Sequence, residues 1–317
     1  MQTFKIKHAL LVGMIGLSAV VMVGCLSART ESGTVPEFDG NRAYGILKKQ
    51  VDIGPRYPGA SGHAVTAEYI QSQLAPYADS VKVQEFSRTI RGKDLGMQNI
   101  IAHFNKGARK WVLLAAHWDT RPIADMEVNP VKKKTAIPGA NDGGSGVAVL
   151  LELAKIFAKQ KPDVGVVMVF FDGEDYGPGV DNMFLGAKEF AAKLPGSAAL
   201  DGKPIAIKYG ILLDMVGDKN LGIYREQNSA EAAPEIVDKV WTTASKLGYK
   251  DKFLDGELDI MDDHLSLIRA GLKCIDIIDF DYGPWHTLDD TPDKCSADSL
   301  KTVGDVVAHV VYEEKPE

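Results

Sequence analysis

Cysteine, long apolar stretches and basic charge are all scarce in this 317-residue sequence. Three cysteines cannot supply a disulfide-stapled scaffold or a thiolate metal cluster, and Cys274 and Cys295 are either bonded to each other or free. The 43 acidic residues outnumber 36 lysines and arginines, and the isoelectric point near 5.6 argues against a nucleic-acid partner. With 45% hydrophobic and 25% charged residues, the composition is that of a globular protein.

The longest uncharged apolar run is at the N-terminus, over residues 9–23. A membrane-spanning helix needs about 20 residues, so this shorter run is typical of a signal peptide. The run ends in Met22-Val23-Gly24-Cys25, which resembles the lipobox of bacterial lipoproteins. We therefore expect a signal peptide over 1–24, lipidation of Cys25 and a polar tether over 25–40. The protein would be exported, membrane-anchored and periplasmic; a plain secretory signal is the alternative.

Helical and strand patterns alternate along the rest of the chain. Continuous apolar strands separated by amphipathic helices predict a largely parallel sheet that is covered on both faces. We predict a single α/β domain over 41–317, with a mixed, mostly parallel central sheet and helices on both faces. Strands are expected at 81–90, 97–104, 111–116, 164–171, 209–213 and 274–278, and helices at 41–51, 61–75, 147–157, 231–247, 263–270 and 296–312.

Residues that can bind a metal or carry a proton follow four of these strands. In chain order they are His117 with Asp119, Glu174 with Asp175, Asp214, and His286. The carboxyl ends of parallel strands meet at one edge of a sheet, so we expect these side chains to share a site. Histidine and carboxylates without thiolates suit a catalytic zinc ion with three protein ligands and one open position.

Three acids near this edge have more than one interpretation. Asp142 lies in the glycine-rich segment 138–146, just before a helix, so it could cap that helix or bind a metal. Glu174 and Asp175 are neighbours, so one can bind a metal while the other transfers protons. Of the acids before the helix at 263–270, Asp263 is suited to capping and Asp262 is free to point elsewhere.

The order of these motifs resembles the zinc aminopeptidase superfamily. Within it, three segments are similar to the glutaminyl-peptide cyclotransferases of animals and their bacterial relatives: Gln50-Val-Asp-Ile-Gly-Pro-Arg56, Met261-Asp-Asp-His264 and Trp285-His-Thr-Leu-Asp-Asp290. The resemblance runs from about residue 42 to the C-terminus. It implies a zinc-exopeptidase-like fold. One departure is Asp175, where the animal cyclases have glutamate.

The resemblance also implies a role for each site residue. Asp142, Asp175 and His286 would bind one zinc ion. Glu174 would be the proton shuttle, with Asp214 and Asp262 as its hydrogen-bonding partners, and Trp285 and Ile260 would be apolar walls. The implied reaction converts the N-terminal glutamine of peptides and exported proteins to pyroglutamate, with release of ammonia.

A zinc aminopeptidase is the main alternative. The five positions that hold two zinc ions in those enzymes are filled by acceptable residues here: His117, Asp142, Asp175, Asp214 and His286. With two metal ions the protein would hydrolyse N-terminal residues from peptides, with Glu174 as the base for the attacking water. A catalytically silent peptide-binding protein is a third class, which the complete set of catalytic residue types disfavours.

Overall fold

The computed structural model describes residues 34–317, and Val35–Glu317 form one compact unit. The predicted signal peptide, Cys25 and most of the predicted tether lie outside the described residues. Within the described part of the chain, no helix is both long and apolar enough to cross a membrane.

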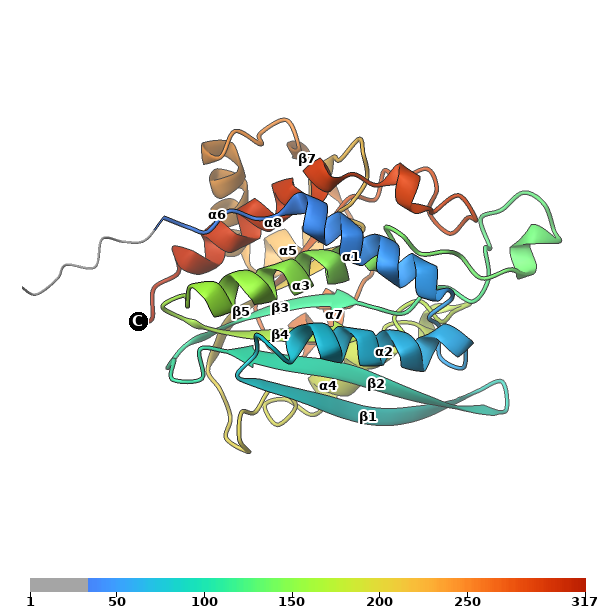
Figure 1. The fold of residues 1–317 in the computed structure, drawn as a ribbon, viewed down its shortest axis with the longest axis horizontal. Helices are drawn as coiled ribbons and strands as arrows, with labels where there is room; N and C mark the ends of the chain where they lie inside the picture. The colour runs from blue at the N-terminus through green and yellow to red at the C-terminus, as the bar shows by residue number, and fades with distance from the viewer. Residues whose placement is uncertain (1–33) are drawn as a thin grey trace, which may run out of the picture. The chain divides into compact units, whose positions relative to one another are not determined.

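The centre of the unit is a six-stranded sheet with the strand order β1-β2-β4-β3-β5-β8 (Figure 1). The pairs β1–β2 and β2–β4 are antiparallel, while β4–β3, β3–β5 and β5–β8 are parallel. The prediction of a mixed, mostly parallel sheet is confirmed. The strands are β1 (Ser80–Ile90), β2 (Lys93–Phe104), β3 (Trp111–His117), β4 (Gly165–Phe171), β5 (Ile207–Asp214) and β8 (Cys274–Ile278).

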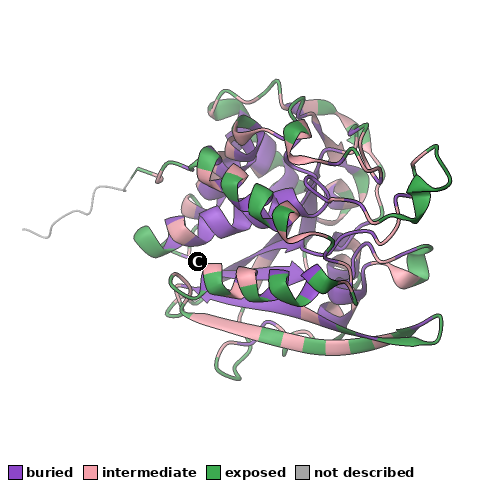
Figure 2. Ribbon diagram, turned by 45° about the vertical axis from the view of Figure 1, so that its right-hand side comes forward, coloured by how far each residue is buried: buried purple, intermediate pink, exposed green. Residues whose placement is uncertain are grey.

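Helices cover both faces of the sheet, as predicted. Alternate strand residues point to opposite faces, so Leu114 packs in one hydrophobic cluster and Leu113 in the other. The first cluster contains α1 (Gly40–Ile53), α2 (Ser61–Leu74), α3 (Gly144–Lys159), α6 (Pro234–Lys246) and α8 (Ala297–Tyr312). The second contains α4 (Leu185–Ala192) and α7 (His264–Arg269). The inner strands are buried throughout, as Figure 2 shows in purple.

Three features differ from the prediction. The helix expected over 231–247 is two helices, α5 (Gln227–Ala232) and α6, because Pro234 cannot continue the first helix and starts the second. The small parallel sheet of β6 (Ile223–Glu226) and β7 (Phe253–Leu258) was not predicted, nor was α4. Both strands are short and partly exposed, so their apolar pattern is weak.

The last residues of the predicted tether pack against the domain. Phe38 is 1% exposed, and a Cβ atom at Gly304 of α8 would lie 2.3 Å from its ring. Asp39 accepts a hydrogen bond from the backbone nitrogen of Arg42 at 3.0 Å and so caps α1. The compact unit therefore begins at Val35.

We expect Phe38→Ala to lower the free energy of unfolding by about 3 kcal/mol, because losing a buried aromatic ring leaves a cavity. Urea denaturation followed by circular dichroism measures the change. Val128→Ala is the matched control, since Val128 is 94% exposed and should lose almost nothing. A loss below about 1 kcal/mol for Phe38→Ala would contradict its place in the core.

Candidate active site

The parallel strands β3, β4, β5 and β8 end at the same edge of the sheet, and the predicted residues meet there. His117, the last residue of β3, is 1% exposed. Its Nε2 atom lies 3.1 Å from Asp214 Oδ1 at the end of β5 and 3.2 Å from Asp142 Oδ1. The expectation that the strand ends bring His117 and Asp214 together agrees with the geometry, and Asp142 joins them from the segment before α3.

Asp142 points into the site and does not cap α3. The residue at the cap position is Gly143, which makes no side-chain capping bond. Asp290 holds the backbone of this segment, since its carboxylate accepts hydrogen bonds from the backbone nitrogens of Asn141 at 2.9 Å and Asp142 at 3.3 Å. Gly143 allows close approach, because a Cβ atom there would lie 2.5 Å from the His117 ring.

Asp142, Asp175 and His286 form a compact set of candidate metal ligands. One ligand atom from each lies within 4.8 Å of the others, and all three residues are at most 4% exposed. His286 Nε2 is 3.3 Å from Asp175 Oδ1 and 3.6 Å from Asp142 Oδ2. Asp175 Oδ2 is buried and has no hydrogen-bond partner in the described part of the chain. A buried carboxylate oxygen without a partner is costly, so these residues fit a bound cation of the zinc class.

A second set shares Asp142 with the first. The ligand atoms of His117, Asp142 and Asp214 also lie within 4.8 Å of one another. The residue types therefore accommodate either one or two metal ions, as the sequence analysis expected.

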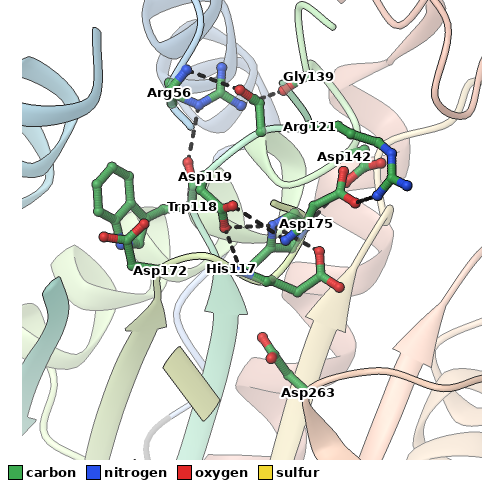
Figure 3. Close-up of polar contacts among 12 residues, drawn as sticks. Arg56, His117, Trp118, Asp119, Arg121, Gly139, Asp142, Asp172, Asp175 and Asp263 are labelled. Atoms are coloured by element: carbon green, nitrogen blue, oxygen red, sulfur yellow. Dashed lines mark hydrogen bonds and ion pairs between the residues drawn. The ribbon is translucent and has the colours of Figure 1, made fainter. Parts of the chain in front are cut away.

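Glu174 and Asp175 point in different directions from one turn. Asp119 fixes this turn, because its carboxylate accepts hydrogen bonds from the backbone nitrogens of Glu174 at 3.0 Å and Asp175 at 3.3 Å (Figure 3). Glu174 Oε2 lies 3.6 Å from His117 Nδ1, whereas Asp175 faces His286. The division into one proton carrier and one metal ligand is consistent with this geometry.

Arg56 of the Gly-Pro-Arg segment is fully buried and holds two backbone segments that carry site residues. Its guanidinium donates hydrogen bonds to the carbonyl oxygens of Trp118 at 3.1 Å, Pro138 at 3.1 Å and Gly139 at 2.6 Å (Figure 3). It thereby joins the end of β3 to the segment that carries Asp142. Burial lowers the pKa of Arg56 to about 10, with partial compensation from Asp290, so it stays charged at neutral pH.

Asp262 lies in the pocket, but the predicted capping by Asp263 is wrong. Asp263 occupies the cap position of α7 without a side-chain bond, and neither of its carboxylate oxygens has a hydrogen-bond partner among the described residues. Asp262 Oδ1 instead accepts a bond from the backbone nitrogen of Asp263. Burial, reinforced by the charge of Asp214, raises the pKa of Asp262 to about 7. Burial likewise raises the pKa of Glu174 well above its usual value, although His117 opposes this.

Apolar side chains line the pocket alongside the acids. The Trp285 ring stacks on His286 with centroids 3.8 Å apart, and Phe280 lies 4.9 Å from Trp285. The predicted wall residues Trp285 and Ile260 both line the pocket. The full lining is Asp142, Glu174, Asp175, Met183, Asp214, Met215, Ile260, Met261, Asp262, Ile278, Phe280, Trp285 and His286.

Sequence reasoning missed several residues that support the site. Arg121 and Asp125 contact Asp175 and His286 from the loop after β3, and no periodic pattern marks them. Asp276 is 1% exposed within β8, where an acid in an apolar strand was a readable signal. Cys274 and Cys295 are both buried and unbonded.

Comparison with known proteins places this site in a family. Residues 99–311 match the model of peptidase family M28. The chain belongs to this family. It is 26% identical to the glutaminyl-peptide cyclotransferase of Drosophila melanogaster over 81% of this chain and 78% of the relative.

Solved structures show the same likeness. The glutaminyl cyclase of Bacteroides thetaiotaomicron bound to N-acetylhistamine is 37% identical with a TM-score of 0.83, covering 89% of this chain and all of that one (100%). A leucine aminopeptidase precursor from the same species is 38% identical with a TM-score of 0.84, covering 89% and 99%. The predicted resemblance to the cyclotransferases and the zinc-exopeptidase-like fold are confirmed.

We expect Asp119→Asn to cost about 1–3 kcal/mol of stability, because the new amide NH₂ group would face a backbone N–H that needs an acceptor. Asp119 is fully buried, so water cannot replace the lost bond. Chemical denaturation measures the loss. Asp181→Asn, at an exposed position, is the control and should be neutral. Equal stability of the two variants would show that Asp119 does not hold the turn.

Proposed function

We propose that this protein is a zinc-dependent glutaminyl-peptide cyclotransferase, which converts an N-terminal glutamine to pyroglutamate and releases ammonia. The observation that carries the proposal is one small pocket that Glu174 and Asp262 line together with the three candidate metal ligands and with apolar side chains. The cyclases among the relatives and solved structures support it, since they match nearly the whole described chain.

Asp142, Asp175 and His286 would hold one zinc ion. Zinc bound there would polarise the side-chain amide carbonyl of the substrate and stabilise the negative charge that develops on its oxygen. The substrate supplies its own nucleophile, because its α-amine attacks the side-chain amide carbon. A C–N bond to the α-amine forms as the bond to the leaving nitrogen breaks, so the reaction consumes no water.

Glu174 would move the proton in this exchange. Its carboxylate would accept a proton from the attacking amine and return it to the leaving nitrogen, which departs as ammonia. A raised pKa suits a group that must both accept and donate, and burial raises the pKa of Glu174. Asp262 and Asp214, which line the same pocket, would hold hydrogen bonds around Glu174 during the transfer.

The apolar wall has a chemical role as well. Trp285, Phe280 and Ile260 line the pocket together with the acids. They would pack against the substrate and exclude water, which would otherwise hydrolyse the activated amide.

A di-zinc aminopeptidase is the second candidate. The observation that favours it is the His117, Asp142 and Asp214 set, whose ligand atoms are also close enough to share an ion. The aminopeptidase precursor among the similar structures points the same way. Against it, His117 Nε2 already lies at hydrogen-bond distance from both carboxylates, so this nitrogen has partners without a metal.

We also propose that the protein is an exported lipoprotein anchored through Cys25 and located in the periplasm. The support is the N-terminal sequence alone, with its apolar run and Gly24-Cys25. Exported proteins that begin with glutamine would then be its natural substrates.

Incubation of the purified, zinc-loaded protein with a glutamine-initiated peptide separates the two activities. We expect mass spectrometry to show loss of one ammonia with the residue count unchanged, because the α-amine attacks in place of water. The same peptide with N-terminal leucine is the control and should stay intact. Loss of the whole first residue from either peptide would establish the aminopeptidase instead.

We expect Glu174→Gln to lower kcat by about 10²- to 10⁴-fold, because the amide cannot carry the proton. Its zinc content should stay at the wild-type level, since Glu174 is outside the set of Asp142, Asp175 and His286. Glu68→Gln, at an exposed position of α2, is the control and should keep full activity. Turnover within threefold of wild type would exclude Glu174 as the proton carrier.

A further inference from the structure

Two charged residues outside the pocket link two of the metal-binding side chains. The Arg121 guanidinium donates a hydrogen bond to Asp175 Oδ1 at 2.5 Å and two bonds to Asp125, at 2.9 Å from Nε and 2.7 Å from Nη2. Asp125 Oδ1 in turn lies 3.0 Å from His286 Nδ1. A continuous chain of contacts therefore runs from Asp175 through Arg121 and Asp125 to His286, and Figure 3 shows its Arg121–Asp175 end.

We infer that Arg121 and Asp125 are positioning residues for the zinc site, and we call them the outer clamp. This inference rests on the zinc site of the proposed function. Neither residue lines the pocket, so the clamp would act on the metal through Asp175 and His286 and would not touch the substrate.

Each half of the clamp has a distinct physical effect. His286 Nδ1 faces Asp125, so its proton stays on Nδ1 and Nε2 is left free for the metal. Nε2 is the nitrogen that faces Asp142 and Asp175. A carboxylate behind a metal-bound histidine fixes the ring and makes it a stronger ligand. Arg121 grips the Asp175 carboxylate with a planar, permanently charged group, which restricts its rotation.

The loop that carries the clamp is attached to the site at further points. The backbone nitrogen of Met126 donates to the carbonyl oxygen of His286 at 3.2 Å, and that of Leu288 donates to Glu127 Oε1 at 3.1 Å. At the other end of the loop, Ile137 donates to the carbonyl oxygen of Arg121. Arg121 is 5% exposed. The clamp is thus held in place by the protein's own backbone and side chains, which is what a positioning role requires.

The clamp also sets where the Asp175 carboxylate lies. The Arg121 guanidinium holds Asp175 Oδ1 from outside the pocket and so limits the positions that this carboxylate can take. An ordinary structural ion pair would stabilise the fold without affecting the metal, so zinc affinity distinguishes the two roles.

Zinc affinity of the purified full chain tests the inference without any substrate. The metal-free protein is titrated with Zn²⁺ in competition with a chromophoric chelator. We expect Arg121→Ala and Asp125→Asn to weaken zinc binding about 10- to 100-fold, the range typical for residues behind metal ligands. Arg121→Lys should fall between wild type and Arg121→Ala, because an ammonium keeps the charge but cannot bridge both carboxylates.

Arg225→Ala is the matched control, since it removes another arginine–aspartate pair, with Asp238, from the surface. Its zinc affinity should equal that of wild type. The Co²⁺-loaded Asp125→Asn protein should also show a shifted visible absorption spectrum, because the basicity of His286 changes. If Arg121→Ala fails to fold, Arg121→Lys and Asp125→Asn still carry the test.

Two results would overturn the inference. Folded Asp125→Asn and Arg121→Lys proteins that bind zinc within twofold of wild type, with an unchanged cobalt spectrum, would reduce the clamp to a structural ion pair. A wild-type protein that binds no zinc would remove the zinc site, and the clamp with it. Zinc binding that depends on the clamp in an enzyme without cyclase activity would keep the inference and reject only the proposed reaction.

Discussion

Buried negative charge at the carboxyl edge of the sheet is the constraint on which the rest of this structure depends. Asp142, Glu174, Asp175, Asp214 and Asp262 are each less than 9% exposed and line one pocket. Ionised carboxylates cannot be removed from water unless cations, hydrogen-bond donors or protons meet them. The surrounding residues supply these partners. Backbone N–H groups donate hydrogen bonds to the nearby acids Asp119 and Asp290, and Arg121 donates to Asp175. His117 faces Asp214, and His286 faces Asp175.

Bound protons also offset part of this buried negative charge. Burial would lower the pKa of His286, but the facing carboxylates of Asp175 and Asp125 outweigh it and raise the pKa to about 9. Deeper in the domain, burial and the charge of Asp262 raise the pKa of Asp276 well above its usual value. A divalent ion held by Asp142, Asp175 and His286 would replace the proton of His286 as the positive charge beside these carboxylates. The deeper carboxyl group of Asp276 would keep its proton.

Structural features that follow from a repeating sequence pattern could be predicted from the sequence. Features that depend on a single contact between residues far apart in the chain could not. The strands around 111–116 and 164–171 were readable because burial on both faces demands an unbroken apolar run. Asp175, Asp214 and His286 could be expected at one edge because each follows a strand and parallel strands end together. Arg121 and Asp125 could not, since a loop has no period that links a residue to partners elsewhere in the fold. The capping expected of Asp263 failed because a short local pattern was outweighed by tertiary position.

Cyclisation and hydrolysis can use the same ligand residues, so the surroundings of those ligands must separate the two chemistries. Asp214 is the residue on which the distinction rests, because a second metal would need its carboxylate. That carboxylate is already 3.1 Å from His117 Nε2, and its charge contributes to the raised pKa of Asp262, a neighbour that stays partly protonated near neutral pH. A protonated Asp262 can donate a hydrogen bond, which an ionised acid cannot. The His117 contact lowers the advantage that a second cation at Asp214 would bring, and this is the physical basis for proposing one metal ion with a proton network beside it.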